Sequence, residues 1–81
     1  MINPKLVLKQ VGDNCRQARR RLAVSQEELG FATGFDRTYI SGIERGVRNP
    51  SILALARLAS GLNVSVAELV SSVPPGKEAK R

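Results

Sequence analysis

The sequence predicts an all-α protein, a compact bundle of five helices. Three observations carry this prediction: apolar residues recur at intervals of three and four, helix-capping residue types stand at the expected boundaries, and no stretch alternates like a β-strand. Only 4% of the residues are aromatic, so the core must be aliphatic. With 81 residues the chain forms one small domain, of a size at which oligomerisation often adds stability.

The first helix is expected over residues 4–22. Its apolar residues step by three and four and share one continuous face: Leu8, Val11, Cys15, Ala18 and Leu22. Cys15 lies on that face, so we expect a small buried core residue and not a reactive thiol.

Two short helices follow the first. Ser25 and Glu28 have the spacing of a capping box and are expected to start the second helix, which Gly34 ends. Asp36 is then expected to cap the third helix, which stops at Gly46.

Ser51 is expected to start a fourth helix and Asn63 to end it in the left-handed conformation. A second capping box, Ser65 with Glu68, starts a short fifth helix. The predicted inward positions of the fourth helix are Ile52, Leu55, Ala59 and Leu62. We expect one domain, residues 4–72, followed by a flexible basic tail over residues 73–81.

Charge and composition narrow the function. Thirteen Lys and Arg residues against seven Asp and Glu give a net charge of +6, which points to nucleic acid or to an anionic membrane surface. The chain has no histidine and one cysteine, so it lacks the usual general base, a zinc cluster and an internal disulfide. We expect no enzyme, no metal, no cofactor and no small-molecule ligand. We expect no membrane span and no signal peptide, and therefore a cytoplasmic protein.

Residues 26–45 are the most informative stretch. They predict two short helices joined by a tight turn, the second polar and ending in an arginine, which is the layout of a DNA-reading helix-turn-helix. Gly30 would let the two helices approach closely. The apolar residues that would fix their crossing are Leu29, Ile40 and Ile43.

Residues 11–72 resemble the Cro/repressor-type helix-turn-helix family of bacterial and phage regulators, the XRE family. The resemblance rests on SQEELGFATGF, DRTYISGIERGVRNPS and LARLASGLNVSVAELV. DRTYISGIERG is similar to the controller proteins of restriction-modification systems. The resemblance implies a lambda repressor-like DNA-binding domain. It also implies a sequence-specific transcriptional regulator, a homodimer that binds palindromic double-stranded DNA with its third helix in the major groove.

The resemblance also assigns roles to residues. Base reading falls on Arg37, Thr38 and Ser41. Phosphate contacts fall on Gln26, Tyr39, Arg45, Arg48 and Asn49. Arg19 and Glu44 match a pair that joins the first helix to the end of the third and orients it.

Several of these roles have an alternative. Arg37 would otherwise only hold a phosphate, and Arg19 would be a further phosphate contact. Gln26 would be a solvated residue, and Tyr39 would be partly buried in the core. Gly42 departs from the family, which often has a long polar reader there; we expect it to permit close approach to DNA or to the second helix, with DNA shape supplying part of the specificity.

The dimer surface is predicted at four apolar residues that exceed the needs of so small a core: Leu53, Val64, Val66 and Val70. Alternatively they complete the core of the monomer. Phe31 replaces a normally polar residue and either covers the first helix or forms an exposed patch. The alternative function is an antitoxin-like interaction module that also binds its own promoter, although the tail is short and polar for a toxin-binding segment. Activation and repression are equally compatible with the sequence.

Overall fold

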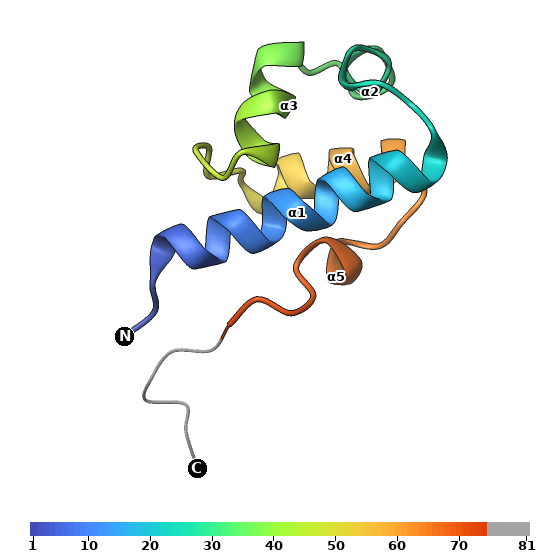
Figure 1. Ribbon diagram of the computed structural model, residues 1–81. Helices are drawn as coiled ribbons and strands as arrows, with labels where there is room; N and C mark the ends of the chain where they lie inside the picture. Colours follow the sequence, from blue (N-terminus) through green and yellow to red (C-terminus); the bar gives the residue numbers. More distant parts are fainter. Residues whose placement is uncertain (75–81) are drawn as a thin grey trace.

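The computed structural model describes residues 1–74 and contains five helices in that part of the chain (Figure 1). They are α1 (Pro4–Leu22), α2 (Gln26–Thr33), α3 (Arg37–Glu44), α4 (Ile52–Leu62) and α5 (Val66–Leu69). No strand occurs among the described residues. The predicted all-α class and the predicted helix order are therefore confirmed.

Side-chain caps start four of the five helices. The Oδ1 of Asn3 accepts from the backbone N–H groups at the start of α1, and the Oγ atoms of Ser25, Ser51 and Ser65 do the same for α2, α4 and α5. The reciprocal capping box of Ser25 and Glu28 is present, as predicted. These local bonds explain why the starts of these helices can be predicted from the sequence.

Two predictions about helix starts need correction, and one about a helix end is confirmed. Asp36 stands at the N-cap of α3, but its side chain makes no capping hydrogen bond. Glu68 does not complete a second box, because its carboxylate pairs with the guanidinium of Arg21. The predicted stop of α3 is confirmed: the helix ends at Glu44, and Gly46 follows its C-cap residue with a φ of +78°.

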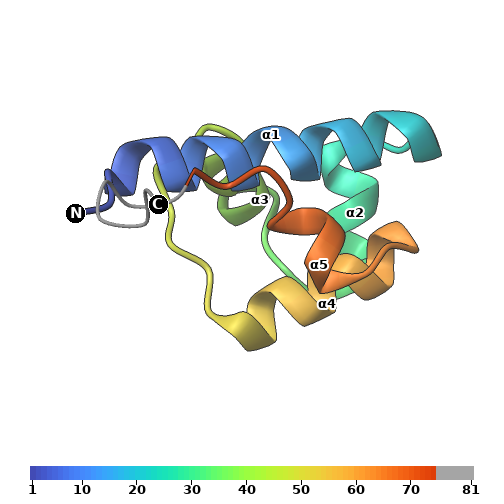
Figure 2. The same cartoon turned by 90° about the horizontal axis from the view of Figure 1, so that it is seen from below.

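The helices pack around α1. In Figure 1, α2 and α3 lie on one side of α1 and α5 lies on the other. Viewed from below, α5 lies over α1 and α4 (Figure 2). α1 contacts α3, α4 and α5, and α4 also contacts α2. The pair formed by α2 and α3 is therefore held from behind by two longer helices, with its other side open to solvent.

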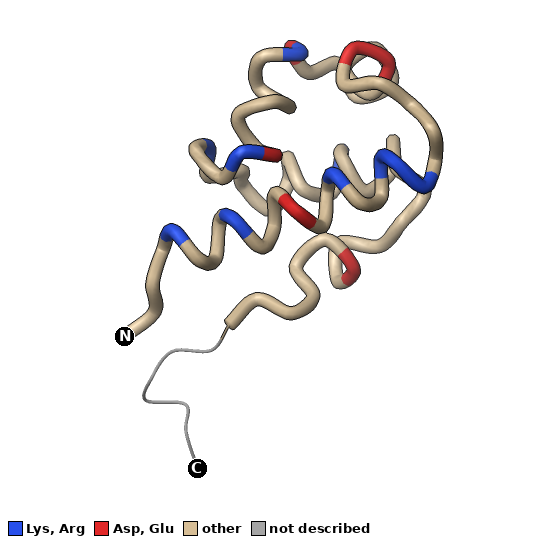
Figure 3. Tube along the Cα trace, in the orientation of Figure 1, with Lys and Arg blue, Asp and Glu red and all other residues tan. Residues whose placement is uncertain are grey.

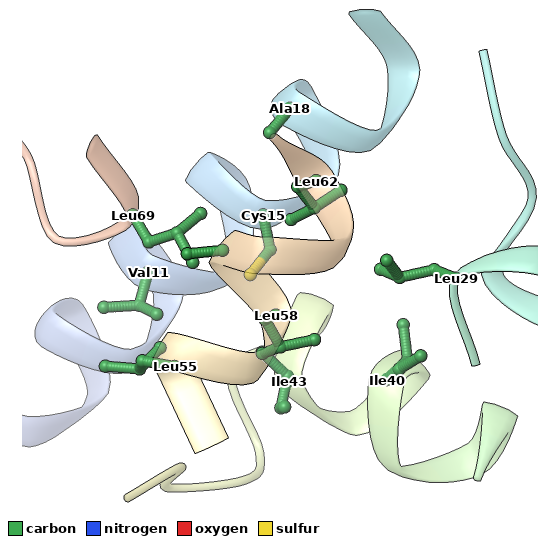
Figure 4. Packing of buried hydrophobic residues seen from close by; sticks show 11 residues of the cluster. Val11, Cys15, Ala18, Leu29, Ile40, Ile43, Leu55, Leu58, Leu62 and Leu69 are labelled. Atoms are coloured by element: carbon green, nitrogen blue, oxygen red, sulfur yellow. The ribbon is translucent and has the colours of Figure 1, made fainter. Parts of the chain in front are cut away.

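The core is aliphatic, as the composition predicts (Figure 4). Cys15 is 1% exposed within it, and burial, followed by the nearby charge of Glu44, raises the pKa of its thiol to about 12. Two residues predicted to face the core do not. Leu22 is the last residue of α1 and Ile52 the first of α4, and both are exposed because the helix ends extend past the core.

The chain after α5 is described only in part. Val73 is half-buried and packs against the core. Most of the predicted tail, residues 75–81, lies outside the described residues. Within residues 1–74, no helix is both long and apolar enough to cross a membrane.

Candidate nucleic-acid interface

The outer face of α3 brings together the three predicted base-reading residues. Arg37 and Thr38 are exposed in its first turn, and Ser41 is half-buried one turn later. These three side chains line one shallow hollow together with Gln26 and Arg45. The Nε of Arg45 also donates to the Ser41 Oγ at 3.3 Å, so this arginine lies along the same face.

Basic residues flank this face. Figure 3 shows basic positions at the start of α3, just after its end and in the loop that follows, whereas α2 carries acidic ones. Arg48 is exposed in that loop. Asn49 is exposed too, but it lines a different, mostly apolar hollow with residues of α1, of α4 and of the chain after α5. The structure thus separates Asn49 from the hollow in front of α3.

Tyr39 lies between the turn and the loop. It is half-buried, and its ring centroid lies 5.0 Å from that of Phe35. The guanidinium carbon of Arg48 lies 6.0 Å from the Tyr39 centroid. Tyr39 therefore contacts the core and also supports a basic residue of the proposed phosphate-binding group.

Gly42 makes room for Arg48. A Cβ atom built at Gly42 would lie 2.6 Å from the Cγ of Arg48, well inside van der Waals contact. Of the two expected neighbours, the second helix is not the one that needs this space, because the nearest atoms belong to the stem of Arg48. Close approach to DNA at Gly42 stays a prediction. A side chain missing from α3 is replaced at this point by one that enters from the following loop.

The rear of α3 ends in a buried ionic group, here called the Glu44 cluster: Arg16, Arg19, Gln26 and Glu44. Glu44 is 2% exposed. The Nε and Nη2 atoms of Arg19 donate to its two carboxylate oxygens at 2.7 and 3.0 Å, and the Nε2 of Gln26 donates to Oε1 at 3.1 Å. The Nε of Arg16 lies 3.5 Å from Oε1, and its Nη2 donates to the Glu44 carbonyl. The cluster joins α1 and α2 to the end of α3.

The electrostatics of the cluster favour the charged form of Glu44. Burial by itself would raise the pKa of this carboxyl group, but the hydrogen bonds from Arg19 and Gln26 and the charges of Arg19 and Arg16 outweigh it and lower the pKa. The hydrogen bond to Glu44 correspondingly raises the pKa of Arg19. Because both carboxylate oxygens have donors, the buried charge is compensated.

The sequence analysis did not predict two residues at the contact between α1 and the end of α3. Arg16 lies three residues before Arg19, which places both guanidinium groups on one face of α1, and that spacing was the available signal. Gly12 lies one turn earlier, where a Cβ atom would be 2.4 Å from the carbonyl oxygen of Ile43. The lack of a side chain at Gly12 lets α1 touch the backbone at the end of α3.

The four predicted dimer residues differ in exposure. Leu53 is 74% exposed and Val70 is at the border of exposure, with 37%. Val64 and Val66 are half-buried and pack against the core. Phe31 is 81% exposed, so it does not cover α1, and no contact explains its position. Among residues 1–74, no three His, Cys, Asp or Glu side chains are grouped so that they could hold a metal.

Two short helices that cross at a tight turn, the second with a polar outer face and a rear bonded to the core, define the helix-turn-helix class of DNA-binding proteins. The family model for this helix-turn-helix matches residues 16–69. The chain belongs to this family of transcription regulators.

Relatives and solved structures agree with this assignment. An uncharacterized HTH-type transcriptional regulator of Sinorhizobium fredii is 44% identical over 63 residues, which are 78% of this chain and 82% of the relative. The crystal structure of the restriction-modification controller protein C.AhdI from Aeromonas hydrophila is similar with a TM-score of 0.74 and 40% identity, over 76% of this chain and 94% of that chain. The structure of the controller protein C.Esp1396I, a tetramer in complex with its natural 35 base-pair operator, is similar with a TM-score of 0.70 and 34% identity. The similarity covers 80% of this chain and 96% of that chain.

Proposed function

We propose that this protein regulates transcription by binding a palindromic operator as a homodimer, with α3 of each copy in the major groove. The observation that carries the proposal is the two-sided nature of α3. Its outer face presents Arg37, Thr38 and Ser41 in one hollow, while its rear is bound to α1 and α2 through the buried Glu44. The protein acts by binding, without catalysis, and in the cytoplasm, where such regulators meet DNA.

The reading residues have distinct chemistry. A guanidinium such as that of Arg37 pairs in a bidentate manner with guanine O6 and N7, and one such pair discriminates by about 1–3 kcal/mol. Thr38 offers a hydroxyl group to a base edge or a methyl group to thymine. Ser41 lies one turn later and reaches a base or a phosphate, because its hydroxyl both donates and accepts.

Phosphate contacts position the protein on the duplex. They are proposed for Gln26, Tyr39, Arg45, Arg48 and Asn49. Gln26 serves two purposes: it bonds to Glu44 and stands at the start of α2, where the helix dipole favours an anion. Because binding releases condensed counterions, the affinity should fall steeply as the salt concentration rises.

A dimer is proposed because one short helix reads too few bases for a specific site. The DNA-binding domain, residues 4–72, would pair through Leu53, Val64, Val66 and Val70. Leu53 gives this surface its most exposed apolar side chain. The oligomeric assembly of the similar controller C.Esp1396I on its operator supports this proposal.

The decisive experiment is selection of bound sequences from a randomised DNA pool. We expect a palindromic consensus whose half-sites are about one helical turn apart, as is usual for dimers of this class. Sedimentation of the protein with the selected duplex should give a dimer per site. A pool that shows no enrichment, or a monomer on the selected DNA, would contradict the proposal.

Replacement of Arg37 tests the reading face directly. Arg37→Ala should weaken binding to the selected duplex by roughly tenfold to a hundredfold, since a guanine pair is lost, and should leave the melting temperature unchanged. Arg21→Ala is the matched control, because it removes the same charge beside α5. Equal operator affinity of the two variants would exclude base reading by Arg37.

A further inference from the structure

The reading end of α3 lacks a cap of its own. Arg37 and Thr38 lie in its first turn, directly after Asp36, whose side chain makes no capping hydrogen bond. The other helices have such a bond at their starts. A side-chain cap therefore does not fix this turn, and contacts from elsewhere in the fold can contribute to its placement.

One residue of α4 supplies such contacts. The Nη2 of Arg57 donates to the carbonyl oxygen of Thr33, at the end of α2, at 2.5 Å. Its guanidinium carbon lies 4.2 Å from the ring centroid of Phe35, in the turn between α2 and α3. At Gly34, between these two residues, a Cβ atom would lie 2.8 Å from the same Nη2. Arg57 thus contacts the whole turn, residues 33–35.

These contacts suit a guanidinium group. The last carbonyl groups of a helix have no partner within it and carry negative partial charge, so a cationic donor is favourable there. The flat, weakly hydrated guanidinium can bond to a carbonyl group and stack on an aromatic ring at the same time, which an ammonium group cannot do equally well.

The turn transmits this contact to the DNA face. Phe35 packs against Tyr39, whose ring lies at 52° to its own, and Tyr39 belongs to α3. The backbone N–H of Phe35 also donates to the Thr33 Oγ1, which ties the turn to the end of α2. A displaced Phe35 would therefore shift the first turn of α3 relative to the rest of the domain.

We propose that Arg57 is a positioning residue for DNA recognition: it places the first turn of α3 through Thr33 and Phe35, and it increases operator discrimination without contacting DNA. The inference rests on the proposed function, because it concerns how the reading residues are held. It assigns to α4 a part in specificity that its sequence position does not reveal.

The test uses the full chain and the duplex that the wild-type protein selects from a randomised pool, with a scrambled duplex for comparison. Arg57→Met should lower the ratio of the two affinities by about tenfold, as expected for losing one stacked cation that also bonds a carbonyl group. Arg57→Lys keeps the charge and should still lose severalfold in that ratio. The matched control, Arg21→Met, should leave the ratio unchanged.

A double-mutant cycle with Phe35→Leu separates positioning from contact with DNA. If Arg57 acts through the ring, Arg57→Met should change the ratio little in the Phe35→Leu background. The salt dependence of operator binding should stay that of the wild type, since no phosphate contact is lost.

Three results would overturn the inference. They are unchanged affinity for both duplexes, an equal loss for both duplexes with a smaller salt slope, and full additivity with Phe35→Leu. If Arg57→Met is unfolded at the assay temperature, the ratio measured for Arg57→Lys decides. Failure of the wild-type protein to select any sequence would instead refute the proposed function, so the two failures are distinguishable.

Discussion

The two ends of α3 are held by different chemistry. At the C-terminal end, Glu44 is buried and receives hydrogen bonds from Arg19 and Gln26. At the N-terminal end, the exposed first turn depends on the packing of Phe35 between Arg57 and Tyr39. The orienting end is thus built from buried, fully bonded charges, and the reading end from an aromatic contact at the surface.

The difference follows from what each end must do. The reading end has to stay accessible, since its side chains must reach base edges, and burial would remove them from the groove. The orienting end has no such requirement and can lie in the interior. A buried ionic group fixes the positions of its side chains closely, because a buried charge that loses its partner destabilises the fold strongly. The fixed C-terminal end orients α3, and the exposed N-terminal end leaves its side chains accessible to DNA.

Breaking the Glu44 cluster should have the largest effect. Arg19→Met leaves the buried carboxylate with fewer donors, and we expect the free energy of unfolding to fall by about 3 kcal/mol. Urea denaturation measures this loss. Arg21→Met is the control, because its exposed ion pair with Glu68 should contribute less than about 1 kcal/mol. Equal losses for the two variants would mean that burial of the cluster is unimportant.

The next effect concerns how closely α1 approaches the same end of α3. Gly12→Ala would place a methyl group against the Ile43 carbonyl oxygen, and backbone atoms cannot move aside as a side chain can. We expect a loss of about 2 kcal/mol in thermal or urea denaturation, in spite of the higher helix propensity of alanine. Gln17→Ala, at an exposed position of the same helix, should be nearly neutral. A stabilised Gly12→Ala variant would disprove this close contact.

The pH dependence of stability should report the cluster as well. Since the fold lowers the pKa of Glu44, this carboxylate stabilises the protein above its pKa in the unfolded chain, and the contribution is lost as the pH falls through the lower, folded-state pKa. The stability difference between the wild type and Glu44→Gln should therefore be constant near neutral pH and shrink under acid conditions. Denaturation curves of both proteins over a pH series test this. A stability difference that grows on acidification would contradict the lowered pKa of Glu44 in the folded protein.

The smallest effect distinguishes capped from uncapped starts. Ser25→Ala removes a capping bond from α2 and should cost about 1 kcal/mol of unfolding free energy. Asp36→Ala removes no such bond from α3 and should cost less than about 0.5 kcal/mol. Thermal melts of both variants are sufficient. Equal costs would show that Asp36 caps α3 in solution, and that its first turn does not depend on Phe35 alone.

Local signals were sufficient for much of the fold. Ser25, Gly34, Ser51 and Asn63 act through bonds and dihedral angles within a few residues, so their effect is visible in the sequence. Asp36 shows the limit: it has the right residue type at the right place, but whether the side chain turns back to the helix depends on its surroundings.

The candidate site was predictable where it resembles a known pattern and unpredictable where it depends on packing. Residues that contact each other across α1, α3 and α4 are separated by many positions, and no periodicity relates Arg57 to Phe35. The sequence marks Gly42 as a departure from the family pattern, but only the structure shows that the stem of Arg48 occupies the space beside it. A single sequence does not indicate when a loop side chain fills the space beside a helical glycine.

The burial of Cys15 provides a probe of the whole domain. It is the only thiol of the chain, it lies 1% exposed among residues of α1, α4 and α5, and its pKa of about 12 leaves almost no thiolate near neutral pH. An alkylating reagent needs both access and thiolate, so it can react only when the core opens. The rate of Cys15 alkylation under native conditions would therefore report how often the core opens. A slower rate in the presence of operator DNA would measure how much DNA binding stabilises the closed domain.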